Sequence, residues 1–158
     1  MKTMMQAFLL GAAIAAAGAA AAADAADPVV GTWNLNVGKS HIDGGPGPKS
    51  QTRTYTQSDD GITLTVDGVA ADGSAISQQA TFKYDGRAYP ITGAADYDAL
   101  TLRRLNASTV KSELMRDGKR IGTTTRTISG HGKVLTLSTH ATSAKGVAYS
   151  AVLVFDKQ

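Results

Sequence analysis

The stretch of sequence that decides the fold is Val29-Val30-Gly31-Thr32-Trp33-Asn34-Leu35-Asn36-Val37, in which apolar and polar residues alternate. Trp33, Leu35 and Val37 share one side of an extended chain, and the polar residues between them share the other. A period of two is typical of a strand with one buried face. Because the stretch also holds the only tryptophan, we predict a strand over 30–37 against which the later strands close.

Nine further strands are predicted from runs of Thr, Val, Ile, Tyr and Phe, which suit a pleated surface. Asp-Gly turns separate many of them, since glycine adopts positive φ without steric cost. The predicted segments are 50–57, 62–69, 75–84, 88–92, 98–105, 109–116, 119–129, 133–142 and 147–156. This meander predicts an all-β, up-and-down antiparallel β-barrel, favoured over a sandwich because closure removes exposed strand edges. The sequence does not decide whether the barrel has eight strands or ten, because the segment 88–92 is short and contains Pro90.

The first 23 residues have the pattern of a secretory signal peptide. Lys2 is followed by an apolar run up to Ala23, and the small residues there allow cleavage after Ala23 or Ala25. A membrane anchor is the alternative, but the run is mostly Ala and Gly rather than Leu, Ile or Phe. We therefore expect a periplasmic or secreted bacterial protein, with its one domain at 29–157 and no membrane anchor after cleavage.

Composition excludes several functions. Cleavage after Ala23 leaves 135 residues, with 15 basic and 13 acidic side chains, a net charge of +2 that is too small to predict nucleic-acid binding. The absence of cysteine excludes disulfides and thiolate metal sites. His41, His131 and His140 are far apart in sequence, so no metal site and no cofactor are predicted. No catalytic motif is present.

One segment does not fit the strand pattern. Gly38–Ser50 contains Gly44-Gly45-Pro46-Gly47-Pro48, and glycine and proline at this density disfavour regular structure. We predict a loop there, the longest of the domain, and a candidate lid or portal.

The rows of threonine indicate which side of each strand faces inward. If Thr52, Thr54 and Thr56 face water, and the alternating threonines of 119–129 do likewise, the opposite faces line the barrel. The predicted lining is Trp33, Leu35, Tyr55, Leu64, Val66, Phe82, Tyr84, Leu100, Leu102, Leu137, Tyr149, Leu153 and Phe155, together with Arg53, Arg104 and Arg126.

Arginines on an inward face predict a wet cavity. An unpaired buried guanidinium is very costly, and most carboxylates of this chain lie in turns. An amphiphilic anion satisfies such a lining, since arginine binds a carboxylate through two hydrogen bonds. The predicted ligand-binding residues are Arg126, Arg104, Arg53, Tyr55, Tyr84 and Tyr149.

The pattern resembles the calycin group, the lipocalins and the fatty-acid-binding proteins. Gly31-Thr32-Trp33 resembles their opening Gly-x-Trp strand, and Val154-Phe155-Asp156-Lys157 resembles the last fatty-acid-binding strand. The whole chain from Val29 to Lys157 is most similar to small exported bacterial lipocalin-like proteins. The resemblance implies structural roles for Gly31 and Trp33, with Trp33 as a plug at the base of the barrel.

The resemblance also has departures. The fatty-acid-binding family has a helix pair where this chain has Gly38–Ser50, and it grips carboxylates with an Arg-x-Tyr whose positions here are Leu153 and Phe155. Arg126 is the surviving match. It either binds an anion or stacks on Trp33 as a structural cation–π partner.

Three functions follow as hypotheses. The first is a monomeric binding protein for a small hydrophobic or amphiphilic molecule. The second is an enzyme in the same barrel, of isomerase or cyclase type, which a buried acid or tyrosine with a displaced pKa would indicate. The third is a filled structural or interaction barrel without a ligand, in which no void larger than a few waters is expected.

Overall fold

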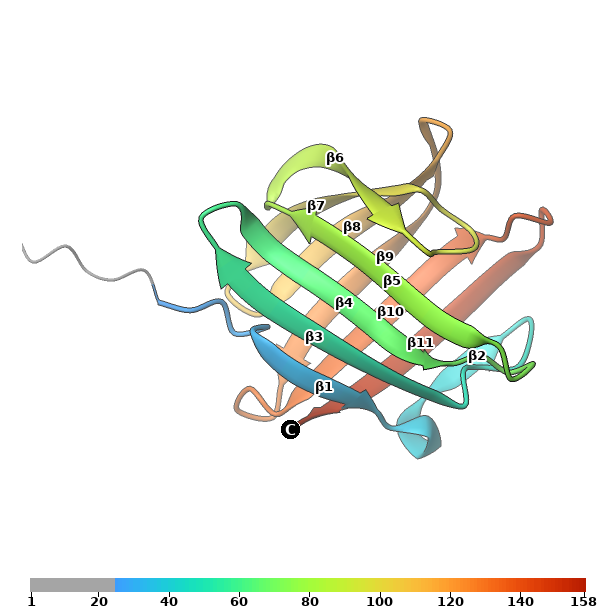
Figure 1. Cartoon of the computed structure of the whole chain (residues 1–158), viewed down its shortest axis with the longest axis horizontal. Coiled ribbons are helices and arrows are strands. Elements are labelled where there is room, and N and C mark those ends of the chain that lie inside the picture. The colour runs from blue at the N-terminus through green and yellow to red at the C-terminus, as the bar shows by residue number, and fades with distance from the viewer. Residues whose placement is uncertain (1–24) are drawn as a thin grey trace, which may run out of the picture.

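Ten of eleven antiparallel strands close into a single barrel in the computed structural model, which describes residues 25–158, and the short strand β2 adds to the edge of β11 (Figure 1). The predicted signal peptide at 1–23 lies outside these residues. The elements are β1 (Gly31–Leu35), η1 (Val37–Lys39), β2 (His41–Asp43), β3 (Ser50–Ser58), β4 (Gly61–Val69), β5 (Ala75–Phe82), β6 (Asp85–Thr92), β7 (Ala99–Asn106), β8 (Thr109–Arg116), β9 (Lys119–Ser129), β10 (Val134–Thr142) and β11 (Ala148–Lys157).

The strand that opens the domain also closes it. β1 pairs with β3 on one side and with β11 on the other, so Trp33 lies between Arg53 and Lys157. From β3 to β11 the strands follow each other in chain order around the ring. The predicted up-and-down antiparallel barrel is therefore confirmed, and the open strand count resolves to ten.

Tight turns make this order possible. β8 and β9 are joined by Asp117-Gly118 alone, with φ values of 50° and 74°. Two successive residues at positive φ form the type I′ turn, whose twist matches that of paired antiparallel strands. The Asp-Gly signal in the sequence thus specifies the hairpin directly.

The predicted loop at Gly38–Ser50 is wrong in part. His41–Asp43 form β2, which pairs with β11 beyond the end of β1, and η1 is inserted between the two. Ser40 holds the insertion, because its hydroxyl donates to Asn36 O and accepts from Val154 N. A three-residue strand flanked by Gly and Pro carries too little pattern to be seen in sequence, and only 44–49 remain as loop.

Pro90 lies within β6 rather than excluding the strand. β6 pairs with β7 along much of its length but with β5 only at Gln79↔Thr92 and Ala80↔Ile91. Proline has no N–H to donate, so it suits a strand whose one side is mostly unpaired. The predicted strand at 88–92 is therefore present, and in the structure it begins earlier, as β6 at Asp85–Thr92.

The two ends of the barrel differ. At the end formed by the start of β1 and the end of β11, Val29, Trp33, Phe82, Leu135 and Phe155 are almost completely buried. We call this end the base. The opposite end, formed by β2 and the turns 70–74, 93–98, 117–118 and 143–147, is the mouth. Within residues 25–158, the structure contains no helix of the length and apolar character that crossing a bilayer requires.

Candidate functional site

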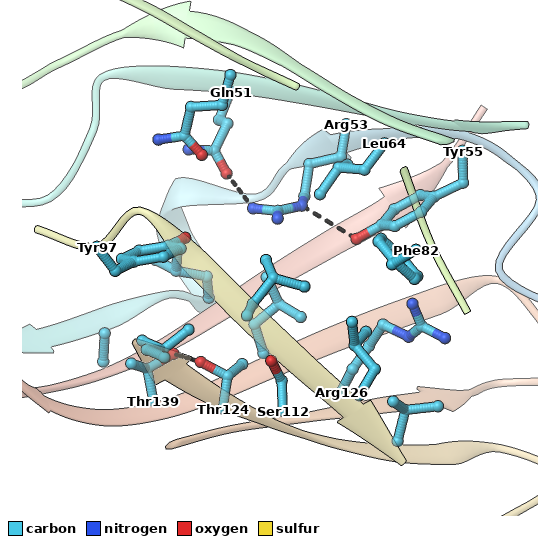
Figure 2. Close-up of a pocket in the computed structure, with 18 of the residues that line it drawn as sticks. Gln51, Arg53, Tyr55, Leu64, Phe82, Tyr97, Ser112, Thr124, Arg126 and Thr139 are labelled. Carbon is cyan, nitrogen blue, oxygen red and sulfur yellow. Dashed lines mark hydrogen bonds between the residues drawn. The ribbon is translucent and has the colours of Figure 1, made fainter. Parts of the chain in front are cut away.

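A cavity of about 240 Å³ lies inside the barrel between the base and the mouth (Figure 2). This is slightly below the common range of about 300–1,000 Å³ for ligand pockets, and it indicates a compact occupant. The lining is half polar and half apolar. The polar residues are Gln51, Arg53, Tyr55, Gln78, Tyr97, Ser112, Thr124, Arg126, Thr139 and Tyr149. The apolar lining is Ile42, Leu64, Phe82, Leu100, Leu102, Val110, Leu114, Leu137, Ala151 and Leu153.

Arg126 is the most buried charged side chain of this cavity. It projects inward from β9 and is 6% exposed. Its Nη2 donates to the Tyr84 hydroxyl at 2.6 Å, and its Cζ lies 5.5 Å from the ring centres of Tyr55 and Tyr84. Burial opposes the charge, but Tyr55, Tyr84 and Asp27 outweigh it, so the pKa of Arg126 is raised. The group therefore stays cationic inside the barrel.

Arg53 brings a second guanidinium into the same cavity from β3. Its Nε donates to the Tyr55 hydroxyl at 3.2 Å and its Nη1 to Gln51 Oε1 at 3.1 Å. Its Cζ lies 5.6 Å from the ring centre of Phe155. Tyr55 thus touches both arginines, since its hydroxyl binds Arg53 and its ring faces Arg126 (Figure 2).

No carboxylate lines this cavity among residues 25–158. Each guanidinium carries five N–H donors, and the contacts just described use one on Arg126 and two on Arg53. All of the partners described are neutral oxygens. The cavity therefore offers positive charge and free donor capacity to a compact anion.

Two tyrosines lie toward the mouth. Burial raises the pKa of Tyr97, and burial also raises the pKa of Tyr149 to about 12, with Asp96 adding to that shift. Both hydroxyls consequently keep their protons at neutral pH. They can donate hydrogen bonds to an occupant but are poorly suited to act as bases.

The loop that carries Tyr97 is tied across the mouth. Arg116 donates from Nε to Asp96 O at 2.7 Å and from Nη2 to Thr142 O at 3.0 Å. Asp96 in turn accepts from Ala144 N at 2.8 Å. These bonds join loops 93–98 and 143–147, so Tyr97 is held in place over the cavity.

Two predicted cavity residues, Arg104 and Tyr84, lie elsewhere. They line a second hollow of about 480 Å³ at the base, outside the main cavity. Tyr84 comes after the last residue of β5, and the β7–β8 register shifts between Arg104 and Asn106. Both side chains have the predicted inward phase, but Tyr84 lies just past β5 and Arg104 lies near the end of β7, so they cover the base instead of the cavity.

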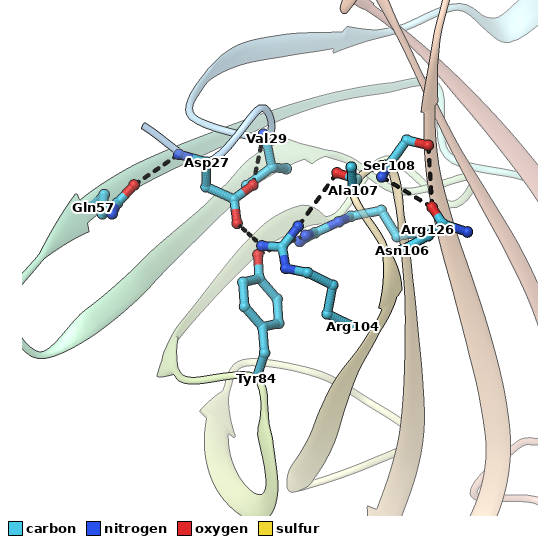
Figure 3. Close-up of polar contacts among 9 residues, drawn as sticks. All are labelled: Asp27, Val29, Gln57, Tyr84, Arg104, Asn106, Ala107, Ser108 and Arg126. Atoms are coloured by element: carbon cyan, nitrogen blue, oxygen red, sulfur yellow. Dashed lines mark hydrogen bonds and ion pairs between the residues drawn. The ribbon is translucent and has the colours of Figure 1, made fainter. Parts of the chain in front are cut away.

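The base hollow is organised by Asp27, which the sequence analysis did not single out. Its side chain is 6% exposed and forms an ion pair with Arg104, whose guanidinium stacks 4.4 Å from the Tyr84 ring centre. Asp27 also accepts from Val29 N at 2.9 Å. Figure 3 shows Tyr84 between these groups and Arg126, so a polar chain connects the N-terminal segment to the cavity arginine.

We expect Asp27→Asn to lower the free energy of unfolding by about 1–2 kcal/mol, because a hydrogen-bonded ion pair is lost. Burial opposes ionisation of Asp27, but its bonds to Val29, Tyr84 and Arg104 outweigh burial, and its pKa is lowered from 3.8. Because the pKa of Asp27 is lower in the folded state, the ionised carboxylate stabilises the fold above the ordinary pKa of 3.8. This contribution to the free energy of unfolding is lost as the pH falls through the lowered folded-state pKa.

Urea unfolding between pH 7 and pH 3 tests this. The difference in the free energy of unfolding between wild type and Asp27→Asn is expected to have its full size at pH 6 and to shrink below about pH 4. Asp72→Asn is the matched control, because Asp72 is an exposed turn acid with a lowered pKa whose hydrogen bonds stay within its own turn. A difference that stays constant with pH would contradict the role of the carboxylate charge.

Trp33 is not part of the cavity lining. It is fully buried, and its Nε1 donates to Val29 O at 2.7 Å. The predicted stacking of Arg126 on Trp33 is wrong: the cation over the indole is Lys157, with Nζ 5.0 Å from the ring centre. Lys157 lies directly opposite Trp33 in the β1–β11 pair, whereas Arg126 is turned toward the tyrosines.

Gly31 has a conformational reason to be glycine. Its φ is 133°, in a region that side chains rarely adopt, and an added Cβ would lie 2.8 Å from Lys157 Cε. Gly31 therefore lets β1 begin beside the end of β11, as a structural residue and not a ligand contact.

The cavity also contains polar residues that the sequence analysis did not select. They are Gln51, Gln78, Tyr97, Ser112, Thr124 and Thr139. The alternation of β9 places Thr124 on the same face as Arg126, a signal present in the sequence. Tyr97 lies in a segment between Asp96 and Asp98 that reads as a solvated turn. Within residues 25–158, no three His, Asp or Glu side chains are grouped as metal ligands would be.

Comparisons with known proteins agree with this architecture. No protein-family model matches the chain, and no curated protein sequence matches it. Among solved structures, the chain is similar to the crystal structure of the zebrafish ileal bile acid-binding protein complexed with cholic acid, with a TM-score of 0.51 and 14% identity. The match covers 83% of this chain and 99% of that chain. The predicted calycin-like barrel, of the lipocalin and fatty-acid-binding-protein type, is thereby confirmed as a fold.

Proposed function

We propose that this protein is an exported, monomeric binding protein that holds one small amphiphilic anion in the barrel cavity. The observation that carries the proposal is the pair of guanidiniums, Arg53 and Arg126, facing a cavity whose described lining has no carboxylate. Burying a cation is costly unless an anion pairs with it directly. Arg126 meets the Asp27 carboxylate only through the Tyr84 hydroxyl, so a bound carboxylate would lower the cost of its burial.

The surroundings of the arginines support an amphiphilic occupant. Half of the lining residues are apolar, among them six leucines, Phe82 and Val110, and Tyr55, Tyr97 and Tyr149 present rings with polar tips. The zebrafish protein with a similar barrel was solved with cholic acid, an amphiphilic acid. Cleavage of the signal peptide after Ala23 or Ala25 would place the folded domain in a periplasm or outside the cell.

The filled-barrel alternative loses support from the cavity, which has room for roughly eight waters at ~30 Å³ each. The enzyme alternative expects an acid or tyrosine poised to move protons. Tyr97 and Tyr149 have raised pKa values that keep them protonated, which suits hydrogen-bond donation to a ligand.

Calorimetric titration of the purified mature protein at pH 7 tests the proposal. The probes are two acids, octanoate and cinnamate, and their neutral analogues 1-octanol and cinnamyl alcohol. At least one acid is expected to bind more than tenfold tighter than its alcohol, because only the acid pairs with the guanidiniums. Acids that fail to bind, or that bind no better than the alcohols, would refute an anion site.

Native mass spectrometry of the protein purified from its own host supplies the natural ligand class. Spectra before and after denaturing extraction are compared, and a mass difference lost on extraction identifies a bound small molecule. A natural ligand without an acidic group would contradict the proposed anion.

A further inference from the structure

A row of hydroxyl groups crosses the wall of the cavity on three neighbouring strands. Ser112 of β8 lies directly opposite Thr124 of β9, which in turn lies opposite Thr139 of β10. All three line the cavity. Because neighbouring strands are about 4.8 Å apart, the row spans roughly 10 Å of wall.

The hydroxyls of this row are not all satisfied by the protein. Thr124 Oγ1 and Thr139 Oγ1 bond each other at 2.8 Å, and each hydroxyl has one proton, so one proton of the pair is left for another acceptor. Ser112 is 9% exposed and points toward the cavity in Figure 2, where no hydrogen bond to the other drawn residues reaches it. The row therefore directs donors and acceptors at whatever fills the cavity.

An alkyl chain would be a poor occupant at this level. It would exclude water from Ser112 and from the free proton of the threonine pair without replacing the lost hydrogen bonds. A buried polar group left without a partner is strongly disfavoured. An occupant with its own oxygen atoms at this level would keep those bonds.

The row has a defined place relative to the cationic end of the cavity. Thr124 comes two residues before Arg126 on β9. It therefore occupies the next inward-facing position of that strand, on the side of the mouth. Two residues of strand span about 7 Å. A carboxylate at Arg126 would thus place the body of a compact acid beside the hydroxyl row.

We infer that the natural ligand is an oxygenated acid, with a hydroxyl or carbonyl group on its body that binds the row Ser112–Thr124–Thr139, and not a plain alkyl acid. The inference rests on the proposed function, because it takes the carboxylate to lie at the arginines.

Calorimetry with matched ligands tests the inference. Cinnamate is compared with 3-hydroxycinnamate and 4-hydroxycinnamate, which keep the carboxylate and ring and add one hydroxyl at two different positions. At least one hydroxy acid is expected to bind about tenfold tighter than cinnamate, the size of one well-made hydrogen bond in a buried site.

Substitutions in the row Ser112–Thr124–Thr139 test whether this row causes the preference for the hydroxy acid over cinnamate. Ser112→Ala with Thr139→Val is expected to reduce the ratio of hydroxy-acid affinity to cinnamate affinity to about one. Thr125→Val is the control, since it removes a hydroxyl from the outer face of β9. Should the double variant fail to fold, Ser112→Ala alone and the wild-type comparison of ligands still decide the outcome.

The possible failures are distinguishable. If none of the cinnamates binds, and the octanoate titration described above also fails, the proposed function is wrong. If cinnamate binds and both hydroxy acids bind equally well or worse, the inference is overturned while the anion site stands. A preference that persists in the double variant also overturns the assignment to this row.

Discussion

Arg126→Gln is expected to weaken the binding of octanoate or cinnamate by about a hundredfold. Hydrogen bonds to charged groups contribute about 1.5–3 kcal/mol, and a loss of 2.7 kcal/mol corresponds to a factor of a hundred in Kd. Arg126 is the more buried of the two cavity arginines, and its contacts among the described residues include one hydrogen bond, to a neutral hydroxyl. Titration calorimetry of the variant and the wild type measures the difference directly.

The same substitution is expected to change stability only modestly. It removes the cost of burying a charge, but it also removes the hydrogen bond to Tyr84 in surroundings that raise the pKa of Arg126 and so favour its charged form. Arg103→Gln is the matched control, because Arg103 is an exposed arginine on the outer face of β7. Equal affinities for Arg126→Gln and wild type would remove Arg126 from the site, and a large loss of stability would make its role structural.

Trp33→Ala is expected to lower the free energy of unfolding by about 3–5 kcal/mol, the usual cost of truncating a fully buried aromatic residue. Trp33 is 0% exposed, packs in the main core and joins β1 to Val29 through its indole N–H. For a domain of this size the melting temperature would fall by roughly 10–20 °C. Thermal unfolding followed by circular dichroism measures this without relying on tryptophan fluorescence.

Trp33→Phe is the informative control for this position. It keeps most of the packing and loses the hydrogen bond to Val29 O, so a smaller loss of about 1–2 kcal/mol is expected. A Trp33→Ala variant that unfolds within 1 kcal/mol of wild type would show that the base of the barrel does not depend on the indole.

The sequence predicted the barrel because its information is local. The alternation of each strand and the two-residue turns between strands depend on neighbours along the chain. Leu64 and Val66 are buried as predicted, and β4 runs from Gly61 to Val69 against a predicted 62–69. The inward phase of Arg53 and Arg126 followed from the same alternation and is confirmed.

The alternation of residues along a strand did not predict where side chains near the strand ends lie. Arg104 and Tyr84 have the inward phase, yet they cover the base, because a side chain near the end of a strand is placed by what packs against it there. That partner is Asp27, far away in sequence, and no period along the chain connects the two. The short strand β2 was missed for a similar reason, since only its pairing with β11 defines it.

By itself, then, the sequence determined which residues face inward and the order in which the strands follow one another, since both depend on periodicity and turn chemistry. Only the tertiary structure decided which inward residues share the cavity. Closure of the ring brings Arg53 and Arg126 together around Tyr55, turns Trp33 toward Lys157, and aligns Ser112, Thr124 and Thr139 in one row. Such contacts depend on strand register and on the ends of the barrel, which a single sequence does not encode locally.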